Sequence, residues 1–291
     1  MSDDDLAFDD EGLNKWTDED RFEVSRERLA QYAKATNDPI AAHLAGDVAA
    51  PVFAIVPVFE SLLTPTVDVA PVELIPRVVH GEQDFHFHRP IRPGDALVSR
   101  GKMIGYEGVK KGTRATVYLE CRTEDGELVN EQFVTCFFRG YVSPRDVGEL
   151  GPSHKFDDTL HGRAPLAKVV SRIDTDQTFR YSAAAGDPMP IHLDEDVAKD
   201  SGLPGIIAHG LCTMAIASWA VLTEVAGSDV NRLKRFAVRF AKMVFPGDEL
   251  ETRIWQAERS GNATTYAFET TRSGEAGEEF AITDGLAVIA D

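Results

Sequence analysis

A repeated motif limits what this 291-residue chain can fold into. Residues 32–43 hold a tyrosine, an Asp-Pro pair and a histidine, and residues 181–192 hold the same residues at the same spacing, 149 positions later. A Pro-Gly-Asp turn follows each copy, at residues 93–95 and 246–248, which are 153 positions apart. The difference of four fits a slightly longer loop in the second copy. We therefore expect two halves with the same fold.

The repeat also predicts the domain boundaries. The first unit is expected to span residues 1–145 and the second residues 165–291, and each is long enough to bury a core of its own. Residues 146–164 between them are polar and rich in Gly and Pro, which is typical of a linker.

Each half shows the same order of expected elements. An early helix, at 25–35 or 175–185, is followed by the Asp-His loop and then by a strongly apolar helix. Pro57 should kink or shorten that helix in the first half. A buried helix followed by antiparallel strands favours an α+β fold in which each sheet wraps around its helix. The expected strands are 77–89, 95–105, 113–123, 129–142, 234–245, 248–258, 263–272 and 279–290, with turns at 124–127 and 273–274.

Composition and charge narrow the class of protein. Hydrophobic residues make up 43% of the chain, and no apolar run reaches the roughly 18 residues that span a bilayer. The start, residues 1–11, is acidic and lacks the order of a secretory signal, so a cytoplasmic protein with no membrane partner is expected. A net charge of −18 repels phosphate backbones and argues against nucleic acid as a partner. Three cysteines without a Cys-x-x-Cys motif predict buried, reduced thiols.

The second copy carries the most specific motif. Residues 186–215 read GDPMPIHLDEDVAKDSGLPGIIAHGLCTMA. This segment resembles the signature of the MaoC-like, or hydratase-2, (R)-specific enoyl-CoA hydratases, Gly-Asp-x-Asn-Pro-(Leu/Ile)-His followed by Ala-His-Gly. Met189 departs from the pattern, because it stands at the Asn position and its thioether cannot donate a hydrogen bond. The matching residues are Gly186, Asp187, Pro190, Ile191, His192, Ala208, His209 and Gly210.

The resemblance implies two fused hotdog units, with a complete site in only one of them. It also implies that the chain adds or removes water across a trans-2-enoyl thioester. The substrate would be an acyl-CoA or acyl-carrier-protein thioester, and no cofactor is expected beyond the coenzyme A of that substrate. The protein is expected to be a monomer or a homodimer.

Asp187 and His192 are the predicted acid–base pair. Hydration of an enoyl thioester needs a group that activates water, a proton for the α-carbon and stabilisation of the enolate oxygen. A carboxylate and an imidazole five residues apart on one loop can both reach a single water. Gly210 opens the buried helix, where a free N–H and the positive end of the helix dipole suit an oxyanion. Gly210, His209 and Ala208 are the predicted oxyanion and substrate-binding residues, and His209 is expected to order the loop.

The first half retains Asp38 and His43 but has AAPVFAIV at residues 49–56 in place of Ala-His-Gly. Pro51 has no N–H to donate, and Phe53 adds bulk where a thioester must approach. We therefore interpret residues 1–145 as a degenerate copy that supports the second and lines the acyl tunnel. A second working site at Asp38 and His43 is the alternative.

Three further possibilities follow from the same residues. Asp187, His192 and His209 match a two-histidine, one-carboxylate metal set, but no pair has the fixed helical spacing of a metalloenzyme motif, so no metal is predicted. The coenzyme A phosphates need cations, and the candidates near the Pro-Gly-Asp turns are Arg89, Arg92 and Lys242. A thioesterase on the same fold and a non-catalytic acyl-thioester binding module are the alternative functions.

Overall fold

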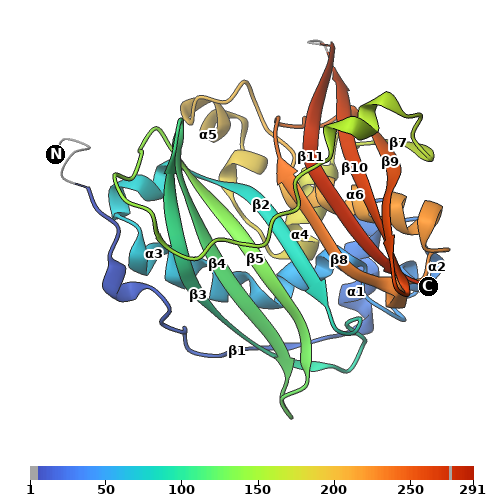
Figure 1. Cartoon of the computed structure of the whole chain (residues 1–291), viewed down its shortest axis with the longest axis horizontal. Helices are drawn as coiled ribbons and strands as arrows, with labels where there is room; N and C mark the ends of the chain where they lie inside the picture. Colours follow the sequence, from blue (N-terminus) through green and yellow to red (C-terminus); the bar gives the residue numbers. More distant parts are fainter. Residues whose placement is uncertain (1–5, 275–276) are drawn as a thin grey trace. The chain divides into compact units, whose positions relative to one another are not determined.

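The computed structural model describes residues 6–274 and 277–291 (Figure 1). Part of the acidic start lies outside the described residues, whereas the residues of the expected turn at 273–274 are described and continue a strand instead. The chain forms two compact units. Of the described residues, unit 1 contains 6–23, 57–88 and 96–153, and unit 2 contains 24–56, 89–95, 154–274 and 277–291.

Unit 1 is built on an antiparallel sheet with the strand order β1-β3-β4-β5-β2. The short strand β6 pairs with β3. Helix α3 (Phe59–Val69) packs against β3 and β4, which places it at the core of this unit. The strands are β1 (Asp20–Glu23), β2 (Val78–Phe87), β3 (Ala96–Val109), β4 (Gly112–Thr123), β5 (Leu128–Arg139) and β6 (Val147–Gly148).

Unit 2 repeats this topology. Its antiparallel sheet has the order β7-β9-β10-β11-β8, so each strand occupies the place of the strand six numbers earlier in unit 1. Helix α6 (Gly210–Val225) packs against β7, β8, β9 and β11, as a central helix wrapped by a sheet must. The strands are β7 (Ala167–Arg172), β8 (Leu233–Phe240), β9 (Glu249–Ser260), β10 (Ala263–Gly274) and β11 (Gly277–Ala290). The two expected copies of one α+β unit are confirmed.

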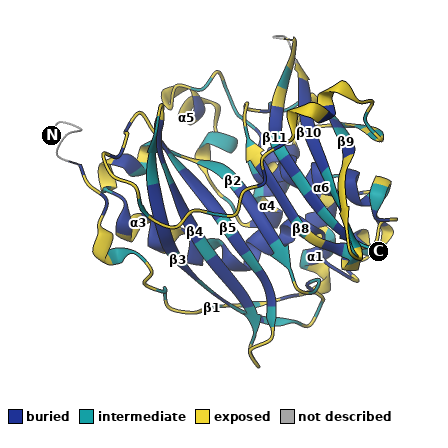
Figure 2. Ribbon diagram, in the orientation of Figure 1, coloured by how far each residue is buried: buried dark blue, intermediate teal, exposed yellow. Residues whose placement is uncertain are grey.

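Helix α6 is the buried helix that the sequence predicts. Every residue from Leu211 to Leu222 is buried (Figure 2). Its one indole, Trp219, donates a hydrogen bond of 3.1 Å from Nε1 to the carbonyl of Thr36 and so has its polar atom satisfied. An apolar helix with no solvent-facing side gains its stability from packing on all sides.

The apolar segment of the first half is not a single α-helix. Residues Pro51–Val58 form the 3₁₀ helix η3, and α3 begins only at Phe59, after Pro57. This confirms that Pro57 shortens the helix, because proline removes an N–H that an α-helix needs. Residues Pro51–Val69 together are long and apolar enough to cross a membrane, contrary to the expectation from the sequence, although 67% of the window is buried inside the structure.

The expected strands agree with the observed ones to within three residues at each end, except that β3 ends four residues later and β8 five residues earlier than expected. Strand β8 ends at Phe240 rather than Phe245, because the backbone then enters a turn in which Phe245 N donates to Asp248 Oδ2 at 2.9 Å. Strands β1, β6 and β7 were not expected. All three are short, and β1 and β7 lie at the edges of their sheets.

The domain boundaries differ from the expected ones. Residues 24–56 lie in unit 2, although the repeat assigns them to the first half. They do so because α1 (Arg26–Ala35) packs against α4 (Gln177–Ala185), its equivalent in the second repeat. Part of the expected linker, residues 146–164, is also buried in the structure and is not an exposed connection. Phe156 and Leu160 are buried in a cluster with Trp255.

The three cysteines are buried and unpaired by disulfides, as predicted. Burial raises the pKa of the Cys212 thiol to about 12, and that of Cys136 to about 11. Both thiols are therefore protonated at neutral pH and pack as small apolar groups.

Candidate active site

The Asp187 loop starts where helix α4 ends. Gly186 caps the helix with a left-handed backbone, φ +77°, which lets the chain turn sharply. Ser182 then holds the turn, since its Oγ donates to the carbonyl of Asp187 at 2.6 Å. The backbone N–H of Met189 donates to Asp187 Oδ1 at 3.1 Å. The main chain at position 189 thus holds the carboxylate, while the Met189 side chain is half exposed.

His192 ends the short 3₁₀ helix η6 (Pro190–His192) with its imidazole fixed at one nitrogen. Nδ1 lies 2.8 Å from the carbonyl oxygen of Ile207, so the Nδ1–H donates and Nε2 keeps its lone pair. Burial lowers the pKa of His192, although the bond to Ile207 and the charge of Asp187 partly oppose it. The neutral imidazole, which can accept a proton at Nε2, is therefore the form present at neutral pH.

His209 lies between the two predicted catalytic side chains and the core. Its ring stacks on that of His192, with centroids 3.8 Å apart, and lies 4.9 Å from the ring of Tyr181. Its Nε2 is 3.9 Å from Asp187 Oδ2. Burial, together with the neighbouring His192, lowers the pKa of His209 to about 3. A neutral, buried ring in this position fixes the orientation of His192.

Gly210 is the first residue of α6, and His209 occupies the N-cap position. Among the described residues, the N–H groups of Gly210 and Leu211 have no hydrogen-bond acceptor, as expected for the first turn of a helix. The loop before them is anchored because Ala208 N donates to the carbonyl of Val244 at 2.7 Å. Asp187, His192, His209 and the start of α6 therefore lie close together.

The same three side chains are the metal candidates. One ligand atom from each of Asp187, His192 and His209 can be chosen so that all lie within 4.8 Å of one another. This proximity alone does not decide between a metal site and acid–base chemistry, and the absence of a metal stays a prediction from the sequence.

The first repeat keeps its Asp and His in a different arrangement. His43 Nδ1 is 2.7 Å from Asp38 Oδ2, and both side chains are almost completely buried. Asp38 Oδ1 accepts from the N–H of Ile40 at 2.8 Å, so the carboxylate is satisfied internally. The η3 helix that follows begins at Pro51 and offers no free N–H there. This pair is closed to solvent, whereas Gly210 and Asp187 are partly accessible.

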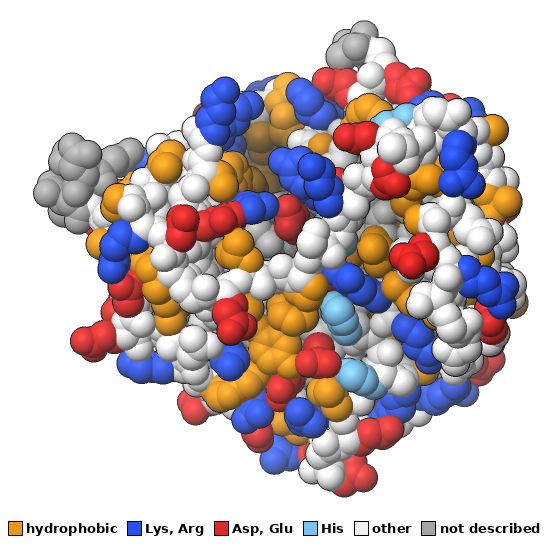
Figure 3. Space-filling view, in the orientation of Figure 1, with side chains coloured by type: hydrophobic (Ala, Val, Ile, Leu, Met, Phe, Trp, Pro, Cys, Tyr) orange, Lys and Arg blue, Asp and Glu red, His pale blue; other side chains and the backbone are white. Residues whose placement is uncertain are grey.

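The three candidate cations for coenzyme A do not gather at one place. Arg89 forms a two-pronged ion pair with Asp95, at 2.8 and 3.1 Å. Arg92 donates to Asn231 just before β8, whereas Lys242 follows the end of β8 and lies 3.5 Å from Glu279. A strand of eight residues separates those two cations by roughly 25 Å. On the face drawn in Figure 3, acidic and basic side chains are interspersed.

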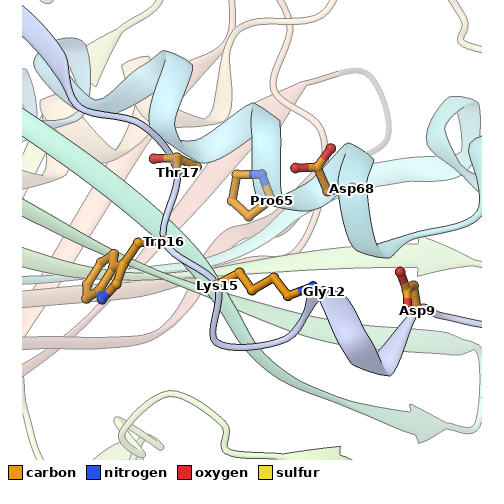
Figure 4. Close-up of a pocket in the computed structure, with 7 residues that line it drawn as sticks. All are labelled: Asp9, Gly12, Lys15, Trp16, Thr17, Pro65 and Asp68. Carbon is orange, nitrogen blue, oxygen red and sulfur yellow. The ribbon is translucent and has the colours of Figure 1, made fainter.

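A cavity of about 280 Å³ lies in unit 1. Figure 4 shows the residues that line it, which are Asp9, Gly12, Lys15, Trp16, Thr17, Pro65 and Asp68. None of the predicted site residues lines this cavity.

Comparison with known proteins identifies the family of the chain. Residues 157–276 match the MaoC like domain, and residues 13–132 match the FAS1-like dehydratase domain region. The chain is 32% identical to the probable enoyl-CoA hydratase 2 of Dictyostelium discoideum, over 73% of this chain and 70% of that protein. It is also 32% identical to 3-hydroxyacyl-thioester dehydratase Y of Mycobacterium tuberculosis, over 69% of this chain and 68% of that protein.

Comparison with solved structures indicates the same family and its fold. A MaoC-like dehydratase from Phytophthora capsici superposes with a TM-score of 0.84 at 25% identity, covering 97% of this chain and 98% of that one. A Mycobacterium tuberculosis protein described as a double hotdog has a TM-score of 0.65 at 14% identity, over 98% of both chains, and supports the fold alone. The expected double hotdog is thereby confirmed, and the chain belongs to the MaoC-like dehydratase family that includes the enoyl-CoA hydratase 2 proteins.

Proposed function

We propose that this protein is an (R)-specific enoyl-CoA hydratase, which adds water across a trans-2-enoyl thioester or removes it from the 3-hydroxyacyl product. The observation that carries the proposal is the convergence of Asp187, His192 and the free N–H of Gly210. These three groups supply a proton acceptor, a proton donor and an oxyanion partner, which are the functions that the reaction requires.

Asp187 and His192 hold and activate one water. The Asp187 carboxylate accepts hydrogen bonds only, and His192 Nε2 has a lone pair because its Nδ1–H is bound to Ile207. The water oxygen bonds to C3 as one of its protons passes to the pair, and the C2=C3 π bond opens toward the thioester. The pair then delivers a proton to C2, so that the elements of water are added with no net charge.

The thioester oxygen gains negative charge as C3 is attacked. The N–H of Gly210 and the dipole of the sixteen-residue helix α6 point at the position where this charge develops. His209 holds the His192 ring by stacking. Burial keeps the His209 ring neutral, so it carries no positive charge in the site.

Other aspects of the function stay predictions. The pair Asp38 and His43 is proposed to be structural, with residues 24–56 supporting the second copy. Coenzyme A or an acyl carrier protein bears the acyl group, and the protein acts as a monomer or homodimer in the cytoplasm. Named relatives include proteins from Arabidopsis thaliana and Mus musculus that are called peroxisomal.

The test is turnover of trans-2-enoyl-CoA substrates by the purified protein. We expect loss of the enoyl ultraviolet absorbance with formation of the (R)-3-hydroxyacyl-CoA, identified by chiral chromatography, and no release of free thiol. Thiol release without a hydroxyacyl product would favour the thioesterase alternative. Tight binding of the substrate without any turnover would favour the binding module.

A further inference from the structure

Helices α1 and α4 each hold the last turn of the other through a side-chain hydrogen bond. The Nε–H of Arg28 on α1 donates to the carbonyl of Ala184 on α4 at 3.0 Å. The Nε2–H of Gln177 on α4 donates to the carbonyl of Ala35 on α1. Both acceptors lie in the last turn of their helix, where a carbonyl has no N–H partner within the helix itself. The two bonds therefore fix the two helix ends.

These two bonds are equivalent in the repeat. Gln177 comes 149 positions after Arg28, and Ala184 comes 149 positions after Ala35, which is the offset of the repeated motif. The donor nitrogen is attached to Cδ in both arginine and glutamine, so it lies equally far along the two side chains. The second bond thus shows that a glutamine can donate in the place of the arginine.

The end of α4 directly supports the candidate catalytic carboxylate. The carbonyl of Ser182 accepts from the N–H of Gly186 at 2.9 Å and from that of Asp187 at 3.2 Å. Arg28 adjoins this turn, because its Nη2 lies 3.4 Å from the position that a Cβ on Gly186 would occupy. The corresponding end of α1 leads to the buried Asp-His pair of the first repeat. Of the two equivalent bonds, only the one from Arg28 therefore stabilises the segment that carries Asp187.

We propose that Arg28, a residue of the first repeat, is a positioning residue for the hydratase reaction. Its bond to Ala184 fixes the last turn of α4 and with it the place of the Asp187 carboxylate. The inference rests on the proposed hydratase function. A carboxylate that shares one water with His192 tolerates little displacement, since a shift of about 1 Å can lower the rate by about a hundredfold. The effect should appear in kcat rather than in KM, because the bond orients a reacting group.

The experiment compares Arg28→Met with Arg28→Gln. Methionine keeps an unbranched side chain but has no N–H to donate, whereas glutamine keeps the donor at the same position. We measure kcat and KM with crotonyl-CoA and the free energy of unfolding in urea. Arg28→Met should lower kcat by about tenfold or more while KM stays within about threefold of wild type. Arg28→Gln should keep kcat within about threefold of wild type.

Arg180→Met is the matched control, because it removes an arginine of α4 that binds the end of α1. Nη1 of Arg180 donates to the carbonyl of Lys34 at 3.0 Å. This change should lower the free energy of unfolding but leave kcat within about threefold of wild type. If Arg28→Met does not fold, as judged by circular dichroism, Arg28→Ala carries the test with the same expected loss of kcat.

Three results would overturn the role of Arg28. They are a kcat within about threefold of wild type in a folded Arg28→Met or Arg28→Ala variant, an Arg28→Gln variant as slow as Arg28→Met, and an equal loss of kcat in Arg180→Met. The last result would mean that any loosening of the helix pair slows the enzyme. Absence of wild-type turnover with crotonyl-CoA would instead contradict the hydratase function itself.

Discussion

The hydroxyl oxygens of Tyr32 and Tyr181 lie 3.4 Å apart in the interior of unit 2, although the residues are 149 positions apart in the chain. They are equivalent residues of the two repeats and lie on α1 and α4. Burial raises the pKa of both phenols, so both are neutral. Because the Tyr181 ring also contacts His209, the first repeat supports the candidate site through this pair.

Replacing Tyr32 with Phe should lower stability more than activity. The change removes one buried hydrogen bond, worth about 1 kcal/mol, and leaves the ring packing intact. Urea unfolding should show this loss, while kcat stays within about threefold of wild type. A loss of kcat above tenfold in a variant of normal stability would mean that Tyr32 takes part in the chemistry.

Removing the charge of the first-repeat pair should also affect folding rather than turnover. His43 Nδ1 lies 2.7 Å from Asp38 Oδ2 in a buried position, although the buried His43 Nε2 has no partner among the described residues, and breaking such a pair typically costs about 3–5 kcal/mol. We expect Asp38→Asn, the mildest change, to lower the unfolding midpoint while kcat stays within about threefold. If the folded variant is as inactive as a variant at Asp187, the first repeat holds a working site.

The pH dependence of activity should report the depressed pKa of His192. Burial lowers this pKa below the ordinary value of 6.5, so the imidazole stays neutral, and able to accept a proton, into weakly acidic solution. The acid limb of the kcat/KM profile should therefore have its midpoint below pH 6.5. A midpoint above pH 7 would contradict the assignment of neutral His192.

His209 should make the protein sensitive to acid. Its folded-state pKa is about 3, so between pH 6.5 and pH 3 the unfolded chain binds a proton that the folded chain does not. Stability attributable to this group is present above pH 6.5 and falls as the pH decreases, by about 1.4 kcal/mol per unit. Between pH 7.5 and pH 5 the loss is about 2 kcal/mol. His209→Phe keeps a ring against His192 and should abolish this part of the loss in urea titrations at the two pH values.

Some features of the site follow from the sequence and others do not. The 149-residue offset predicts that Tyr32 and Tyr181 are equivalent, and the Ala-His-Gly motif correctly places Gly210 at the start of a buried helix. The partner of His192 could not be predicted, because it is the backbone carbonyl of Ile207, and any residue there offers the same group. The close approach of the Phe240 ring to Gly210 was also missed, since it comes from a strand thirty residues downstream.

Other differences arise from tertiary packing. Arg89 appeared available for a phosphate, but Asp95 six residues later turns back and binds it. The expected domain boundary at residue 145 comes from the similarity of the two repeats. The compact units are instead determined by the packing of α1 on α4, which places residues 24–56 in the second unit. Local sequence patterns give element boundaries well but do not reveal which side chains find each other across the fold.

The most direct test of the account is the turnover of Asp187→Asn and His192→Ala with crotonyl-CoA, measured beside wild type in proteins shown to be folded. We expect each single change to lower kcat/KM by about a hundredfold or more, the usual scale for a positioned acid or base. The double variant should be little worse than either single one, because the two groups act on one water. Activity within a few-fold of wild type in either single variant would contradict the assignment of these residues as the catalytic pair.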